Sequence, residues 1–175
     1  LISLGQLDEA IVVIKNALQC IPKNLEPACK LQLAQSYLSQ HRIDEAASLF
    51  EDVMRQNPGD IAAVLGMVSI HLKDGYPHKA LSMLEPLKVQ HLNNVTFMVN
   101  YSLSLFECME VDRALDTLQD VLARFPESKE ALSNALLLTN YTPRHDHYLD
   151  LIKKKILNAY PAIDEISAPS TRNQK

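Results

Sequence analysis

The chain has 175 residues, 47% of them apolar, and a formal net charge of -4. This length and apolar content suffice for one domain with a buried core, and the acidic balance gives no electrostatic reason to expect nucleic acid as a partner. No apolar run approaches the roughly 18 residues of a membrane span, and no stretch reads as a signal peptide. With only 4 Gly, 6% aromatic residues and no alternating strand pattern, the sequence predicts an all-α protein.

Apolar spacing predicts helices along most of the chain. The first lies at about 7–20. The chain lacks an initiator Met and opens with LISLG, which reads as the tail of a preceding helix, so we expect a fragment of a longer protein. Three pairs should follow, at 26–39 with 43–56, at 60–73 with 77–90, and at 94–107 with 111–124. Pro86 lies inside the helix predicted at 77–90 and removes a backbone hydrogen bond, so we expect a kink or an early end there.

Two segments complete the predicted organisation. A helix at about 127–141 has no repeating partner and is ended by the sequence TPRHD. An apolar stripe then predicts a helix within 142–161 that caps the stack, as the end of a solenoid requires; it consists of Tyr148, Leu151, Ile152, Ile156 and Ala159. From Ala162 onward the periodicity is lost, so 162–175 is expected to be a mobile tail or linker.

The second helices of the pairs share one construction. Each carries an alanine followed four residues later by a large apolar residue, in the pairs Ala10–Ile14, Ala46–Phe50, Ala80–Leu84 and Ala114–Leu118. The alanines recur at intervals of 36, 34 and 34 residues, and a proline stands twelve residues after three of them. We expect all four alanines to be almost fully buried where the two helices of a repeat cross.

This period and signature resemble the tetratricopeptide repeat, a pair of antiparallel helices of 34 residues. The resemblance covers 1–141 and implies a right-handed superhelical solenoid with a partial first repeat, three full repeats and one extra first helix. It also implies a concave face formed by the first helices. The partner-binding residues expected there are Leu31, Gln35, Leu38, Leu65, Ser69, Leu72, Val99, Asn100, Leu103, Phe106 and Asn134.

The expected groove is largely apolar, which suits a peptide or an amphipathic helix of a protein partner. It holds no Lys or Arg, and this disfavours the carboxylate-holding role of chaperone-binding members of the family. Asn100 and Asn134 could pair with the backbone of a partner, because an amide both donates and accepts hydrogen bonds. Alternatively, the leucines fill the core between repeats and the asparagines bridge neighbouring helices.

A second resemblance lies at the end of the array. Ser133 and Asn134, then five mostly apolar residues, then Asn140, Tyr141 and Pro143 resemble the junction between repeats and transferase domain in bacterial relatives of O-linked N-acetylglucosamine transferase. Those enzymes carry a row of asparagines at the sixth position of each repeat, which Asn100 and Asn134 match and Gln32 and Gly66 do not. The chain could therefore be the substrate-recognition arm of a larger transferase. A chaperone for hydrophobic secreted proteins is a further alternative for an acidic chain of three to four repeats.

The sequence offers no catalytic constellation. It has no glycine-rich phosphate loop, no nucleophile elbow and no zinc-binding helix, so we expect no enzyme activity, no cofactor and no metal. His145 and His147 flank Asp146 without a third ligand nearby. The cysteines, Cys20, Cys29 and Cys108, are expected to fill helix interfaces as small hydrophobes in a reducing, cytoplasmic compartment. Self-association stays open.

Overall fold

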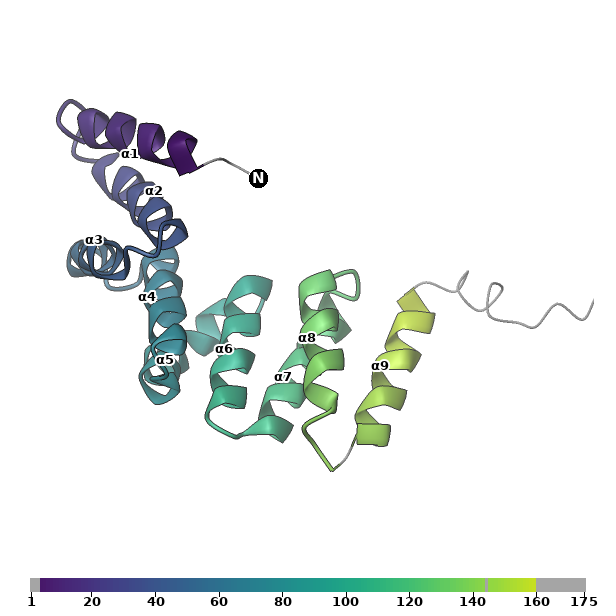
Figure 1. Ribbon diagram of the computed structural model, residues 1–175. Helices are drawn as coiled ribbons and strands as arrows, with labels where there is room; N and C mark the ends of the chain where they lie inside the picture. The colour runs from purple at the N-terminus through teal and green to yellow at the C-terminus, as the bar shows by residue number, and fades with distance from the viewer. Residues whose placement is uncertain (1–3, 144, 160–175) are drawn as a thin grey trace, which may run out of the picture. The chain divides into compact units, whose positions relative to one another are not determined.

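The computed structural model describes residues 4–143 and 145–159 of the chain. Both ranges fold into helices joined by short turns, and neither contains a strand, so the expected all-α class is confirmed (Figure 1). The chain divides into two compact units, Leu1–Gln90 and His91–Lys175.

The first unit holds one helix followed by two helix pairs. Its elements are α1 (Leu4–Leu18), α2 (Glu26–Ser39), α3 (Ile43–Gln56), α4 (Ile61–Lys73), α5 (Pro77–Leu84) and the 3-10 helix η1 (Glu85–His91). Within the pairs, α2 packs on α3 and α4 packs on α5. In addition, α1 contacts α2, and α3 of the first pair contacts α4 of the second. The bounds of α2 and α3 are those that the sequence predicts.

The helix that contains Pro86 ends early, as expected. α5 stops at Leu84, and the chain continues from Glu85 as the 3-10 helix η1. Proline has no N–H with which to continue the α-helical hydrogen bonding, so the chain tightens into the narrower helix at this point.

Apolar side chains from α1 to α4 form the core of the first unit. Ala46, Phe50 and Val53 lie on one face of α3, and all three are buried. The other buried members of this core are Ile11, Leu33, Ala34, Tyr37, Ala63, Met67 and Ile70. The face that the sequence pattern of α3 predicts is therefore the face that packs.

The four repeat alanines are not equally buried. Ala46, Ala80 and Ala114 have no exposed surface, as expected for a close helix crossing. Ala10 is only half-buried, so the prediction for this residue is wrong. α2 covers part of α1, but no helix precedes α1 in the described residues to pair with it as α2 pairs with α3.

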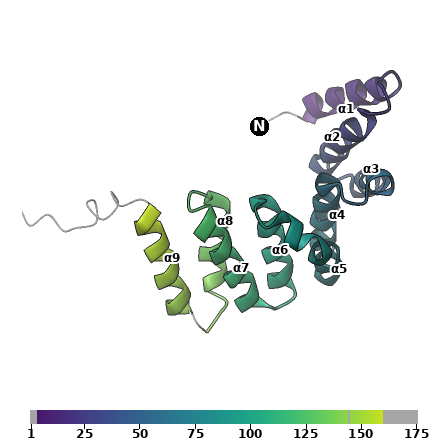
Figure 2. The same cartoon turned by 180° about the vertical axis from the view of Figure 1, so that it is seen from behind.

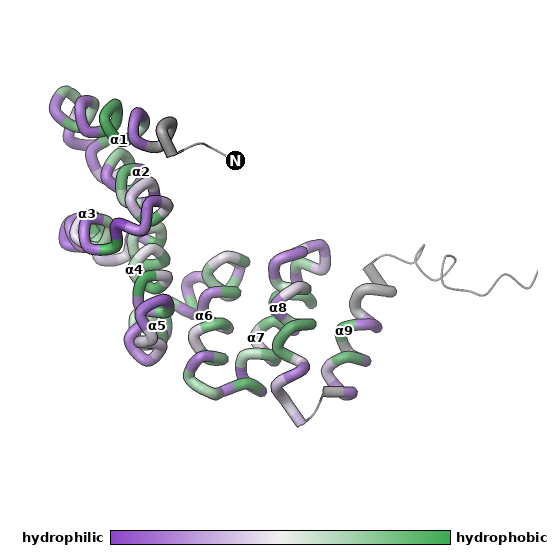
Figure 3. Tube along the Cα trace, viewed as in Figure 1, coloured by the Kyte–Doolittle hydropathy of each residue, from purple (hydrophilic) through white to green (hydrophobic). Residues whose placement is uncertain are grey.

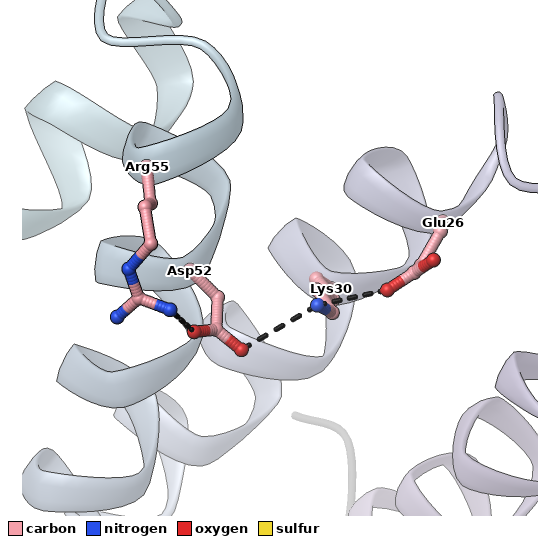
Figure 4. Close-up of polar contacts among 4 residues, drawn as sticks. All are labelled: Glu26, Lys30, Asp52 and Arg55. Carbon is pink, nitrogen blue, oxygen red and sulfur yellow. Dashed lines mark hydrogen bonds and ion pairs between the residues drawn. The ribbon is translucent and has the colours of Figure 1, made fainter.

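An ionic bridge links the two helices of the first complete pair (Figure 4). Lys30 of α2 lies 2.9 Å from a carboxylate oxygen of Glu26 and 3.4 Å from one of Asp52 on α3. Asp52 also pairs with Arg55 at 2.9 Å. The hydrogen bond to Glu26 and the charge of Asp52 raise the pKa of Lys30 above its ordinary value, against the opposing effect of burial.

Each helix pair turns through the same backbone arrangement. His41, Gly75 and Met109 have positive φ angles of 59°, 75° and 65°. The residue after each donates its N–H to the carbonyl five positions earlier, namely Arg42 to Tyr37, Tyr76 to His71 and Glu110 to Leu105. This is the Schellman pattern, which satisfies carbonyls at a helix end. Glycine adopts a positive φ angle without strain, whereas the same backbone conformation is strained for His41 and Met109.

The described residues of the second unit form four complete helices, seen from behind in Figure 2. They are α6 (Val95–Glu107), α7 (Val111–Arg124), α8 (Lys129–Thr139) and α9 (His145–Ala159). α6 packs on α7, α7 on α8 and α8 on α9. Side chains of the preceding residues cap two of them: Asn94 accepts a hydrogen bond from Phe97 N, and Ser128 accepts one from Ala131 N.

α9 packs against the rest of the unit through part of its predicted apolar stripe. Tyr148 and Ile152 are buried, and the Tyr148 hydroxyl donates to Asp116 of α7 at 2.9 Å. The structure does not describe the side chains of Leu151, Ile156 and Ala159. Residues 160–175, which include the predicted tail, also lie outside the described part of the chain. The capping role and the domain bounds stay predictions.

Candidate protein-interaction surfaces

In the first unit, the expected partner-binding residues offer unequal amounts of surface. Leu31 and Leu38 are half-buried and pack against the core cluster. Gln35, on the same helix, is exposed. Three residues of α4 are half-buried, namely Leu65, Ser69 and Leu72. The core-filling alternative therefore accounts for the contacts of Leu31 and Leu38, while Gln35 is free to face a partner.

Phe50 from the preceding helix occupies the space at the sixth position of the α4 repeat. A Cβ atom added to Gly66 would lie less than 3.0 Å from three ring carbons of Phe50. Sequence comparison alone treats Gly66 as a departure from the row of asparagines. In the structure it is the small partner of a large ring, and a bulkier side chain does not fit there.

In the second unit, two expected contact residues are committed to the protein itself. Val99 is only 1% exposed, so its side chain offers almost no surface to a partner. The Asn100 side chain donates to the carbonyl of Thr96, one turn earlier in the same helix, at 2.8 Å. This bond lies within one helix and is not a bridge to a neighbouring helix, and the partner-binding role of Asn100 stays a prediction. Leu103 and Asn134 are half-buried.

Phe106 belongs to an exposed apolar patch that also includes two residues outside the expected set. Its ring meets the ring of Tyr141 edge-on, with centroids 5.1 Å apart. Tyr141 is 61% exposed, and Leu137, near the end of α8, is 57% exposed. Figure 3 shows α8 becoming more hydrophobic toward this end. We call Phe106, Leu137 and Tyr141 the apolar patch. Tyr141 lies beyond the end of α8, so the helical period of that helix does not identify its place beside Phe106.

A cavity of about 480 Å³ lies beside the apolar patch. It lies where the turn between α6 and α7 meets the segment after α8, and Tyr141 belongs to both the patch and the cavity. The residues lining this turn pocket are Met109, Glu110, Val111, Asp112, Arg113, Tyr141, Thr142 and Pro143. The Thr142 hydroxyl donates to Asp112 at 2.9 Å, which joins the two sides.

The turn pocket and the equivalent turn of the first unit carry opposite ion pairs. Glu110 pairs with Arg113 at the start of α7, whereas Arg42 pairs with Glu45 at the start of α3. The hydrogen bond between Arg42 and Glu45 raises the pKa of the Arg42 guanidinium and lowers the pKa of the Glu45 carboxyl. Arg113 also donates to the Tyr101 hydroxyl at 3.3 Å. A carboxylate therefore stands at the turn pocket where the other turn has a guanidinium.

The cysteines are free thiols in different environments. Cys29 and Cys108 are half-buried, as expected for small hydrophobes, but Cys20 is exposed, so the interface prediction for Cys20 is wrong. α1 ends at Leu18, two residues before Cys20, which leaves the thiol in the following turn. Burial, with the charges of Glu110 and Glu107, raises the pKa of Cys108.

The described residues also bear on metal binding and on membrane insertion. Within residues 4–143 and 145–159, no three His, Cys, Asp or Glu side chains come together as a metal site would require. None of the described helices combines the length and apolar character needed to cross a membrane.

Comparison with known proteins identifies the repeat. Two tetratricopeptide repeat family models match the sequence, one at residues 37–95 and the other at 97–128. No curated protein matches it in sequence.

Solved structures of MamA share the fold. A MamA RS-1 double mutant aligns with a TM-score of 0.72 at 15% identity, over 92% of this chain and 89% of that one. MamA from Desulfovibrio magneticus RS-1 gives 0.71 at 14% identity, over 89% and 88%. A further crystal structure of MamA gives 0.70 at 17% identity, over 91% and 92%. Stacked repeats of this kind form extended surfaces that bind other proteins. From its helix pairs and the two matching models, we conclude that the chain belongs to the tetratricopeptide repeat family.

Proposed function

We propose that the chain is a non-catalytic scaffold that binds a peptide or helix of a protein partner through its first helices. The apolar patch of Phe106, Leu137 and Tyr141 is the observation that carries this proposal. Leu137 and Tyr141 are large apolar side chains with more than half of their surface in contact with water. Exposed apolar groups that gather in one place usually mark an interface.

The patch has the composition of a binding site for an extended or helical segment. Covering its apolar surface would stabilise a complex by roughly 25 cal/mol for each Å² removed from water. Tyrosine contributes a large rigid ring that loses little conformational freedom on binding. Asn134 and Asn140, on the same helix as Leu137 or at its end, provide amide groups that could pair with a partner's backbone.

We propose that the first unit contributes a second surface of the same kind. Gln35 is exposed on α2, and Leu65, Ser69 and Leu72 of α4 retain part of their surface. Leu31, Leu38 and Val99 then act as packing residues behind these surfaces. A transferase arm and a chaperone for secreted proteins would use the same surfaces, and both alternatives stay predictions.

Selection from a randomised nonapeptide library displayed on phage tests the proposal. Peptides selected on the wild-type chain should lose at least about tenfold in affinity for Leu137→Ser and for Tyr141→Ala, which corresponds to about 1.4 kcal/mol. Leu136→Ser is the matched control, because Leu136 is the neighbouring residue and is also exposed, at 40%. All three residues are exposed, so thermal melting should show that the variants remain folded.

Either of two results would overturn the proposal. If the library yields no binders, or if the binders ignore both patch substitutions, the first helices of the second unit are not the docking surface.

A further inference from the structure

The turn pocket combines exposed apolar side chains with an excess of carboxylates. Met109 is 84% exposed and Tyr141 is 61% exposed, and both line the cavity of about 480 Å³. Among the described residues that line the pocket, two are carboxylates, Glu110 and Asp112, and one is a cation, Arg113. An opening of this kind suits a side chain that is apolar along its length and positive at its end.

The backbone at the pocket is held in a costly conformation. Met109 has a φ angle of 65°, which glycine adopts without strain and methionine does not. The equivalent position in the α4–α5 turn is Gly75, so the fold accommodates glycine there. Methionine at this position places a long, adaptable apolar side chain at the mouth of the pocket despite the backbone strain. Such a side chain is suited to adaptable binding surfaces.

The charges at the pocket are arranged so that its single cation is held by the protein. The Arg113 guanidinium pairs with Glu110 and donates to the Tyr101 hydroxyl. Asp112 also lines the pocket and accepts a hydrogen bond from the Thr142 hydroxyl. The pKa of the neighbouring Cys108 thiol is raised by burial and then by Glu110 and Glu107, which is consistent with a negative potential at the turn.

We propose that the turn pocket binds a lysine or arginine side chain of the partner protein. The aliphatic stem lies against Met109 and the ring of Tyr141, and the positive head lies beside Glu110 and Asp112. This deepens the proposed function and rests on it, because Tyr141 joins the pocket to the apolar patch. A partner segment that covers the patch would thus place one basic residue beyond its apolar ones.

The chain already uses this combination for its own cations. The Arg42 guanidinium lies 4.3 Å from the ring centre of Tyr37 and pairs with the Glu45 carboxylate. The Lys79 ammonium lies 4.5 Å from the ring centre of Tyr76. Tyrosine rings therefore accommodate basic side chains in this fold, and in the case of Arg42 a carboxylate pairs with the same cation.

The nonapeptide library selection provides the test. Peptides selected on the wild-type chain should be enriched in Lys and Arg at one position, and the enrichment should disappear with the double variant Glu110→Gln, Asp112→Asn. The control is Asp120→Asn with Glu127→Gln, which removes the same charge from exposed residues of the same unit and should leave the enrichment unchanged. Arg144→Gln, which removes the positive charge next to Pro143 in sequence, should leave affinity equal or tighter.

A synthetic peptide separates the charge from the stem. Replacing its basic residue with norleucine, which keeps an aliphatic chain without the charge, should weaken binding at least about tenfold at low salt and less at high salt. Binders without Lys or Arg enrichment, or an equally tight norleucine peptide, would overturn the inference and leave the proposed function standing. A library without any binders would overturn both.

Discussion

Phe50 and Gly66 fit one another across the packing of α3 on α4, because the Phe50 ring occupies the space that any side chain at position 66 would need. Alanine at position 66 would gain about 1 kcal/mol of helix propensity, but overpacking a buried ring costs about 1–3 kcal/mol. The clash should prevail, so Gly66→Ala should lower the free energy of unfolding by about 1 kcal/mol, measured by urea denaturation.

A second substitution isolates the cause of this effect. Leucine stands at the positions equivalent to Phe50 in later repeats, Leu84 and Leu118. In a Phe50→Leu background, Gly66→Ala should cost less than in the wild type, and the difference measures the coupling. Gly59→Ala serves as a control, since the nearest atom to its added Cβ lies at 3.8 Å. A wild-type chain stabilised by Gly66→Ala would contradict the packing argument.

Introducing glycine at one turn and removing it at another should change the stability of the protein in opposite directions. His41→Gly should stabilise the protein by up to about 1 kcal/mol, because it relieves a positive φ angle. Gly75→Ala should destabilise it by about 1 kcal/mol or more, although no atom lies within 4 Å of the added Cβ. The open space removes steric contact as an explanation. Equal changes of the same sign in the two melting curves would refute the backbone argument.

The unequal burial of the repeat alanines can be tested with one substitution at two positions. Ala46→Leu places extra atoms in a closed helix crossing and should cost about 1–3 kcal/mol. Ala10→Leu, at the half-buried equivalent in α1, should cost clearly less. Chemical denaturation of the two variants compares them directly. Similar losses at both positions would show that Ala10 is as enclosed as Ala46.

Lys30 predicts a pH dependence with a defined sign. Its pKa is raised in the folded state, so its stabilising effect is fully present below the ordinary value of 10.5 and is lost as the pH rises through the folded pKa. Val64 and Met98 occupy the equivalent positions and are buried, so Lys30→Met should fold. The stability of the wild type relative to this variant should stay constant up to the ordinary pKa of 10.5 and fall as the pH rises above it, by less than about 1 kcal/mol. If the difference in stability between the two proteins did not change with pH, the ion pairs of Lys30 would contribute nothing to stability.

The thiols of Cys20 and Cys108 should react at different rates. At pH 8, alkylation followed by mass spectrometry should modify Cys20 first, because it is exposed. Cys108 should react slowly, since it is half-buried and its raised pKa lowers the fraction of thiolate. In denaturant, the difference between Cys20 and Cys108 should nearly vanish. Equal rates in the native protein would contradict the burial of Cys108.

Helix positions were predictable because their signals are local. The limits of α2, α3 and α7 follow from apolar spacing and charged first turns, and the early end of α5 follows from Pro86 alone. The family signature rests on buried alanines, whose spacing is visible in sequence. Only Ala10 departs from it, since no helix precedes α1 in the described residues to enclose this side chain.

The individual surface residues were less predictable because exposure depends on several neighbours at once. Val99 and Leu103 occupy similar positions on one face of α6, yet Val99 is buried and Leu103 is not. The Asn100 amide bonds within its own helix, a choice that residue type alone does not determine. Tyr141 gains its place beside Phe106 from the turn after α8, where sequence periodicity has ended.

Every principal helix contact described joins elements that are neighbours, or next neighbours, along the chain. Contacts so close in sequence cost little loop-closure entropy, so such a chain is expected to fold rapidly from several starting points. The same locality limits cooperativity, because a weakened helix pair can open while others stay folded. A substitution near Gly66 should thus accelerate amide exchange mainly in α3 and α4, and leave the exchange of α8 close to that of the unaltered protein.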